Sequence, residues 1–67
     1  MLPKELIKEF IGKVCEITLF NASLGVCGKI EAVEDNWIKV NEKGKIRLLN
    51  GDMIMNIKIM PEKYQKQ

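Results

Sequence analysis

Few side chains in this sequence are able to perform acid–base, nucleophilic or metal chemistry. Its 67 residues include no His, the commonest general base and metal ligand, and only two Cys, Cys15 and Cys27. Neither cysteine has a His partner or a CxxC spacing, so both are poor zinc ligands and poor nucleophiles. Glu34 and Asp35 are adjacent carboxylates, but such residues in a turn usually serve the turn itself. We therefore predict no enzymatic activity, no catalytic residue, no metal site, no cofactor and no small-molecule substrate.

Two amide side chains are better candidates for a binding site. Asn36 follows the Glu34-Asp35 pair, and Asn50 opens a second polar turn. An amide can pair with the edge of a nucleobase, and Arg47, the only Arg, could contact a phosphate. In a second interpretation the amides only hold turns through hydrogen bonds, and the lone Arg is solvated. The residues alone leave both interpretations open.

The periodicity of the apolar residues predicts the elements that position these side chains. Apolar residues recur at helical spacing over residues 3–11, and Gly12 can end that helix. Between residues 13 and 60 the pattern changes to alternation broken by short polar turns, which indicates five strands. We predict a mainly β fold in which residues 1–61 form one domain and residues 62–67 a polar tail. The domain would be a short helix followed by a five-stranded, strongly bent antiparallel small β-barrel.

Strand alternation also assigns a face to each cysteine. Cys15 falls on the apolar face of the first strand, and Cys27 falls on the polar face of the second. Side chains on opposite faces of a sheet do not meet disulfide geometry, so we predict no disulfide. On the second strand the same alternation places Ala32 inward and Val33 outward.

Apolar residues continue on both sides of the turn Asn50-Gly51-Asp52. Two short strands joined by so small a break cannot shield both of their apolar faces alone. Because an uncovered edge strand invites pairing with another chain, we predict a homo-oligomer, either a ring or a dimer. Trp37 could instead be a platform for base stacking, and the methionines could form an adaptable binding surface. The residues expected at the subunit interface are Trp37, Leu48, Met53, Met55 and Ile57.

The net charge and the N-terminal residues limit which other classes of partner we expect. The formal net charge of +2 does not by itself demand a nucleic acid, because affinity grows with the number of phosphates neutralised. The N-terminus has no signal-like segment, and no apolar run approaches the length of a transmembrane helix. We therefore predict a cytoplasmic protein with no membrane partner.

Three segments resemble the motifs of a known family. Residues 10–19 resemble the start of the first Sm motif, in which a glycine after a helix precedes alternating apolar residues. Residues 28–36 resemble the second strand of that motif, and residues 48–57 resemble the second Sm motif. The chain thus resembles the Sm-like (Lsm/Hfq-like) family over about positions 5–60, as a divergent small member of bacterial type.

The resemblance implies a fold and a function. Sm-like proteins have a helix that caps a five-stranded, SH3-like barrel, and they form rings by pairing strand four of one subunit with strand five of the next. The rings bind RNA, usually single-stranded and rich in uridine or adenosine. Asn50 stands where the family carries Arg, so hydrogen bonding is kept while the charge and the stacking plane are lost. The RNA-binding candidates, Arg47 included, are Asp35, Asn36, Arg47, Asn50 and Gly51.

Three functions follow from these observations. The first is a homo-oligomeric Sm-like module that binds single-stranded RNA at the turns carrying Asn36 and Asn50. The second is an oligomeric scaffold or protein-binding module of the same fold with no RNA ligand. The third is a monomeric barrel of Tudor-like or ribosomal-type topology that recognises a peptide or structured RNA. Fold alone does not separate them. Alternation places Trp37 off the face of Asn36.

Overall fold

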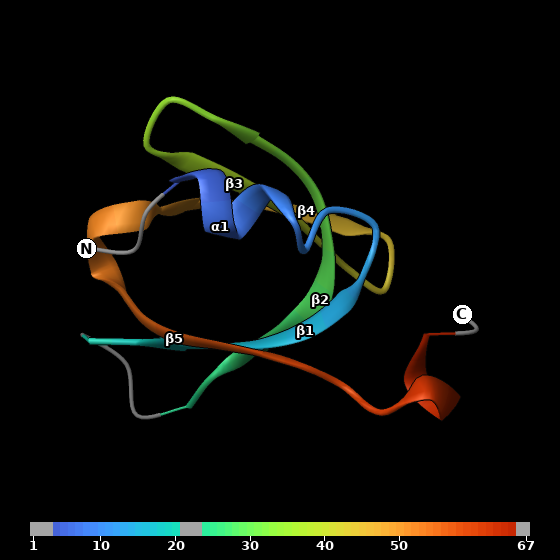
Figure 1. The fold of residues 1–67 in the computed structure, drawn as a ribbon. Coiled ribbons are helices and arrows are strands. Elements are labelled where there is room, and N and C mark those ends of the chain that lie inside the picture. The colour runs from blue at the N-terminus through green and yellow to red at the C-terminus, as the bar shows by residue number, and fades with distance from the viewer. Residues whose placement is uncertain (1–3, 21–23, 66–67) are drawn as a thin grey trace.

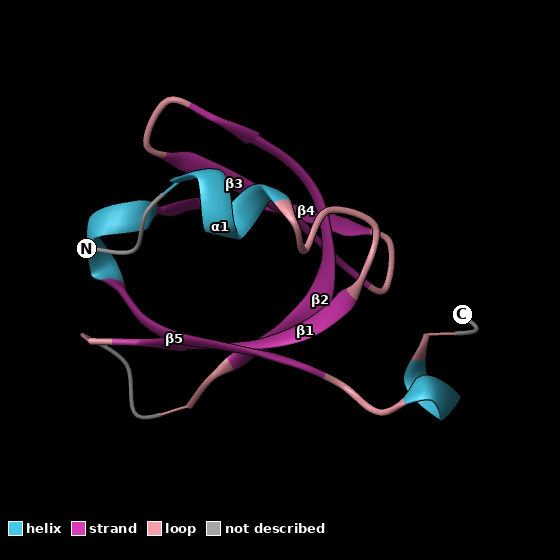
Figure 2. Ribbon diagram, in the orientation of Figure 1, coloured by secondary structure: helices cyan, strands magenta, loops and turns pink. Residues whose placement is uncertain are grey.

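Five antiparallel strands in one strongly curved sheet, preceded by a short helix, make up the protein (Figures 1 and 2). The structure is a computed structural model in which residues 4–20 and 24–65 are described. The strand order is β4-β3-β2-β1-β5. This arrangement confirms the mainly β fold with one N-terminal helix. The elements are α1 (Lys4–Lys8), β1 (Val14–Leu19), β2 (Val26–Glu34), β3 (Trp37–Glu42), β4 (Lys45–Asn50), β5 (Ile54–Ile59) and two 3₁₀ turns, η1 (Gly51–Met53) and η2 (Glu62–Tyr64).

The helix is shorter than the apolar spacing predicts. After Lys8 the chain continues in tight turns, in which the N–H of Phe10 donates to the carbonyl of Ile7 at 2.9 Å. Gly12 then takes a φ of 90°, a left-handed conformation that glycine adopts without strain, and its N–H donates to the carbonyl of Ile30 at 2.8 Å. This bond ties the end of the helical segment to β2.

The apolar side of the curved sheet forms the core. Ile7 of α1 enters this core, and Phe10 and Ile57 pack against it. Cys15 is fully buried and Cys27 is exposed, and both are free thiols, as the alternation predicted. The buried apolar residues are Ile7, Cys15, Ile17, Leu19, Val26, Ile30, Val33, Ile38, Val40, Leu49 and Ile54.

A bulge in β2 overturns one prediction. The register between β2 and β3 shifts between Ile30 and Ala32, so alternation changes face at that point. Val33 is therefore buried and Ala32 only half-buried, the reverse of the predicted order. Gly28 allows the sheet to bend, because a Cβ there would lie 2.6 Å from the carbonyl oxygen of Asn41.

The connection from β3 to β4 is a hairpin, whereas the connection from β4 to β5 is not. Lys43 and Gly44 have φ values of 50° and 94° and join β3 to β4 in a tight hairpin. The turn that begins at Asn50 instead forms η1 and carries the chain to the other edge of the sheet, where β5 pairs with β1. In the described residues, β4 and β5 therefore do not pair with each other, and each leaves one edge open.

The C-terminal residues are more structured than a plain polar tail. Residues 62–64 form η2, and Gln65 hydrogen-bonds to the backbone of β1. Residues 66–67 lie outside the described part of the chain. Within that part, no helix has the length and apolar character needed to cross a membrane.

Candidate functional site

The two predicted amides, Asn36 and Asn50, lie side by side. Asn36 belongs to the turn between β2 and β3, and Asn50 ends β4. The Nδ2 of Asn36 donates to the Oδ1 of Asn50 at 2.9 Å, and the N–H of Gly51 donates to the backbone carbonyl of Asn36 at 2.7 Å. The register of β3 and β4 causes this meeting, because it pairs Trp37, the residue after Asn36, with Asn50.

Asn50 also caps the turn that follows it. Its Oδ1 accepts a second hydrogen bond, from the N–H of Asp52 at 2.9 Å, which satisfies a free donor at the start of η1. Gly51 is buried under Asn36, and a Cβ at this position would lie 2.6 Å from the Oδ1 of Asn36. Asn50 therefore holds the turn that follows it, and Gly51 is required for the close approach of the two turns.

The pair still has hydrogen-bonding capacity to offer a ligand. Among the described residues, the Nδ2 of Asn50 and the Oδ1 of Asn36 have no hydrogen-bond partner. Both residues are half-buried, and their remaining groups are one donor and one acceptor. The edge of a nucleobase presents donors and acceptors of the same two kinds.

The other candidate residues divide between this site and the rest of β4. Asp35 is exposed beside Asn36, with a φ of 52°. Arg47 is not brought to the site: it lies three positions before Asn50, so its side chain leaves the opposite face of the strand. Its Nη1 lies 3.5 Å from the Oε1 of Glu42, in an exposed ion pair. The site therefore consists of two amides, a glycine and one carboxylate.

Trp37 is a neighbour of the site that strand alternation alone did not find. It lies directly opposite Asn50 in the pairing of β3 with β4, and its side chain is 49% exposed. Directly opposed residues in an antiparallel pair share a face, so the indole lies on the face from which Asn50 projects. The prediction that Trp37 lies off the face of Asn36 compared two neighbours in the sequence. It could not include Asn50, because the register between β3 and β4 is not visible in the sequence.

Both open edges of the sheet carry exposed apolar side chains. On β4, Ile46 and Leu48 are 52% and 62% exposed, and on β5, Met55 and Ile59 are 50% and 45% exposed. Ile57 is half-buried against the core. Leu48, Met55 and Ile57, three of the predicted interface residues, thus lie on the two edge strands. Trp37 lies on β3, and Met53 lies in η1, where its carbonyl accepts the N–H of Phe20 at 2.8 Å.

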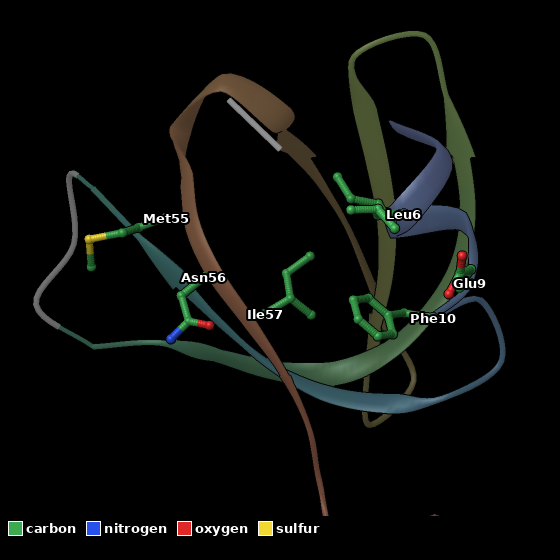
Figure 3. Close-up of a pocket in the computed structure, with 7 residues that line it drawn as sticks. Leu6, Glu9, Phe10, Met55, Asn56 and Ile57 are labelled. Atoms are coloured by element: carbon green, nitrogen blue, oxygen red, sulfur yellow. The ribbon is translucent and has the colours of Figure 1, made fainter. Parts of the chain in front are cut away.

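An apolar pocket of about 340 Å³ lies between the helical segment and β5 (Figure 3). Leu6 and Phe10 of the helical segment and Met55 and Ile57 of β5 are among the residues that line it. Figure 3 shows Phe10 and Ile57 facing each other across it. The sequence predicted apolar residues at helical spacing over residues 3–11, but not that part of this apolar surface stays open beside an unpaired strand. The full lining is Leu6, Ile7, Glu9, Phe10, Met55, Asn56 and Ile57.

Comparison with known proteins identifies the architecture. No family model and no curated protein matches this sequence. Among solved structures, the chain is similar to an Sm-like protein, AF-Sm2, from Archaeoglobus fulgidus, with a TM-score of 0.71 over 90% of this chain and 96% of that one. The chain has an Sm-like fold. The sequence identity of 21% extends the likeness to the fold alone, so the bacterial-type subclass stays a prediction.

Metal chemistry has no visible basis in the described residues. Within 4–20 and 24–65, no group of three or more His, Cys, Asp or Glu side chains is placed to hold a metal ion. Burial raises the pKa of the Cys15 thiol, and the nearby Cys27 adds to that effect. A raised pKa disfavours the thiolate, which is the form that binds metals and attacks electrophiles.

Proposed function

We propose that this protein is a homo-oligomeric Sm-like module that binds single-stranded RNA at the turns carrying Asn36 and Asn50. The observation that supports it is the amide pair itself, which leaves the Nδ2 of Asn50 and the Oδ1 of Asn36 for a base edge. The half-exposed indole of Trp37 offers an apolar surface on the same side of β3. Asp35 lies beside the amides and can accept from an exocyclic amino group.

Binding at one such site is expected to be weak. Arg47 is paired with Glu42, and the chain carries a net charge of only +2, so few phosphates would be neutralised per subunit. Affinity would then come from several subunits of one oligomer that bind the same RNA strand, because once one subunit is bound, binding by the next is effectively intramolecular. The RNA-binding proposal therefore depends on assembly.

The two open edges support assembly. They belong to different strands, so pairing β4 of one subunit with β5 of the next is a head-to-tail contact that repeats and can close into a ring. Exposed Ile46 and Leu48 would be covered on one side and Met55 and Ile59 on the other. The apolar pocket beside β5 would accept side chains of the incoming strand.

One measurement tests assembly and ligand class together. Light scattering should give a mass above that of the 7.7 kDa monomer, and the mass should rise on addition of oligo-uridine or oligo-adenosine at low salt. Asn50→Ala should lose this binding. Asn41→Ala is the matched control, because the Oδ1 of Asn41 likewise holds a turn, accepting the N–H of Gly44 at 2.7 Å, away from the amide pair. No binding to either homopolymer at low salt would refute RNA recognition.

The alternative is an oligomeric scaffold or protein-binding module without an RNA ligand. One observation favours it: the Oδ1 of Asn50 is already used by two donors within the protein. An oligomer that binds neither homopolymer would select this function. A concentration-independent monomer would exclude both oligomeric functions and favour a monomeric binding domain.

A further inference from the structure

The side chain of Gln65 holds the C-terminal turn against the sheet. Its Oε1 accepts the backbone N–H of Val14 at 2.6 Å. Its Nε2 donates to the carbonyl of Val14 at 2.8 Å and to the carbonyl of Met60 at 3.0 Å. One carboxamide thus makes three hydrogen bonds to backbone groups at the start of β1 and the end of β5.

These bonds satisfy backbone groups of β1 that lie beyond the end of its pairing with β5. The last paired residues of β1 and β5 are Cys15 and Ile59, after which the N–H of Met60 reaches the carbonyl of Val14 at 3.0 Å. Pro61 then turns the chain away from the sheet, and the N–H of Val14 would have no backbone partner on that side. The carboxamide of Gln65 supplies the acceptor and donor that a further strand residue would have supplied.

Little else holds this turn in place. Its remaining backbone bonds are internal, from Tyr64 N–H to the Pro61 carbonyl at 2.9 Å and from Gln65 N–H to the Glu62 carbonyl at 3.0 Å. No residue of η2 is buried. Among the described residues, Gln65 is the only one after Pro61 whose side chain hydrogen-bonds to the sheet.

The held turn forms one wall of a groove on the outer face of the sheet, about 610 Å³ in volume. Tyr64 and Gln65 line this wall, and the N-terminal half of β2 and the β3–β4 hairpin line the rest. Figure 1 shows the turn following β5, beyond the end of that strand. The residues on the other walls include Cys27, Lys29, Glu31, Asn41 and Lys43.

We propose that the segment Pro61–Gln65 is a detachable strap, fastened to β1 by the Gln65 carboxamide, that closes one side of this groove and hinders the approach of bulky groups to the exposed Cys27 thiol. Because the fastening lies in one side chain and the turn buries no residue, loss of that side chain releases the strap without opening the sheet. The three bonds that hold the strap lie within one subunit, so the proposal does not rest on RNA binding or on assembly.

The test compares the rates at which two reagents modify Cys27. A bulky polyethylene-glycol maleimide reports steric access, and iodoacetamide reports the intrinsic reactivity of the thiol. Gln65→Ala removes all three hydrogen bonds and should raise the maleimide rate by at least about tenfold, the factor that corresponds to roughly one net hydrogen bond, while leaving the iodoacetamide rate nearly unchanged. Glu62→Ala is the matched control, because Glu62 is exposed in the same turn and its side chain has no partner among the described residues.

Two further variants keep the proposal open to refutation. Gln65→Asn retains the amide on a side chain one methylene shorter, which cannot span the same three bonds, so it should behave like Gln65→Ala. Cys27→Ser combined with Gln65→Ala leaves only buried Cys15, which should stay unreactive if the sheet is intact. Equal maleimide rates in the wild type and both Gln65 variants would overturn the strap. Rapid modification of Cys15 would overturn it too, since the change would then have opened the fold.

Discussion

Substitution of Asn50 can separate its role in the fold from its role in binding. Asn50→Ala removes both hydrogen bonds that the Oδ1 accepts, from Asn36 and from Asp52, each at 2.9 Å. A net hydrogen bond contributes about 0.5–1.5 kcal/mol, and water can replace the lost acceptor at exposed Asp52. We therefore expect a loss of about 1–2 kcal/mol in the free energy of unfolding, in line with the usual cost of removing an N-cap.

Asn50→Asp is the informative partner of that variant. A carboxylate accepts hydrogen bonds as well as an amide oxygen does, and Asp is a favoured N-cap, so both bonds to Oδ1 are kept. The substitution removes the Nδ2 donor, which has no partner among the described residues, and places a negative charge where an RNA strand would lie. We expect stability close to that of the wild type together with loss of RNA binding.

Urea unfolding followed by circular dichroism gives the stability, and fluorescence anisotropy with labelled oligo-uridine or oligo-adenosine gives the binding. All variants are compared at one protein concentration, because assembly would make stability depend on concentration. Wild-type RNA affinity in Asn50→Asp would refute the proposed site. If Asn50→Asp lost as much stability as Asn50→Ala, the assignment of the two hydrogen bonds to Oδ1 would be wrong.

Two other predictions concern the edge strands and the buried thiol. Leu48→Lys places a charge on the exposed edge strand β4 and should lower the mass measured by light scattering. Leu24→Lys is the control and should leave the mass unchanged, because Leu24 is 82% exposed and lies on neither edge strand. Equal masses for the wild type and both variants would argue against assembly through β4. Burial raises the pKa of the Cys15 thiol above its ordinary value of 9.0, so the folded state holds its proton more tightly than the unfolded state does. Stability from this group is complete below pH 9.0 and falls as the pH rises toward the folded-state pKa. Urea midpoints measured below and above pH 9.0 should show that the wild type loses stability as the pH rises and that Cys15→Ala loses less. Identical pH dependence in the two proteins would contradict this prediction.

The features that the sequence predicted well depend on near neighbours in the chain. Alternation placed Cys15 inside and Cys27 outside, because side chains of successive strand residues point to opposite faces. The two amides were chosen because of the turns they occupy; Asn50 caps the turn that follows it, and Asn36 donates to Asn50 from the neighbouring turn. Each of these conclusions needs only a few consecutive residues.

The features it missed depend on contacts between distant segments. The bulge between Ile30 and Ala32 reverses the faces of β2, and it appears only when β2 is laid against β3. The position of Trp37 opposite Asn50 is a matter of register between two strands. Gln65 reaches Val14 across 51 positions of the chain, and nothing in the composition of residues 62–67 distinguishes it from the polar residues around it.

The turn after Asn50 connects the proposed binding site to the proposed interface. Asn50 ends one edge strand, and η1, which it caps, leads directly into the other edge strand. A neighbouring subunit paired with β4 or β5 would therefore hold one flank of the segment that carries the amide pair. Ordering these flanks before RNA arrives reduces the entropy that binding must overcome. On this reasoning assembly does more than multiply weak sites: it also prepares each one, so a variant that blocks assembly through β4 should weaken RNA binding even with Asn36 and Asn50 intact.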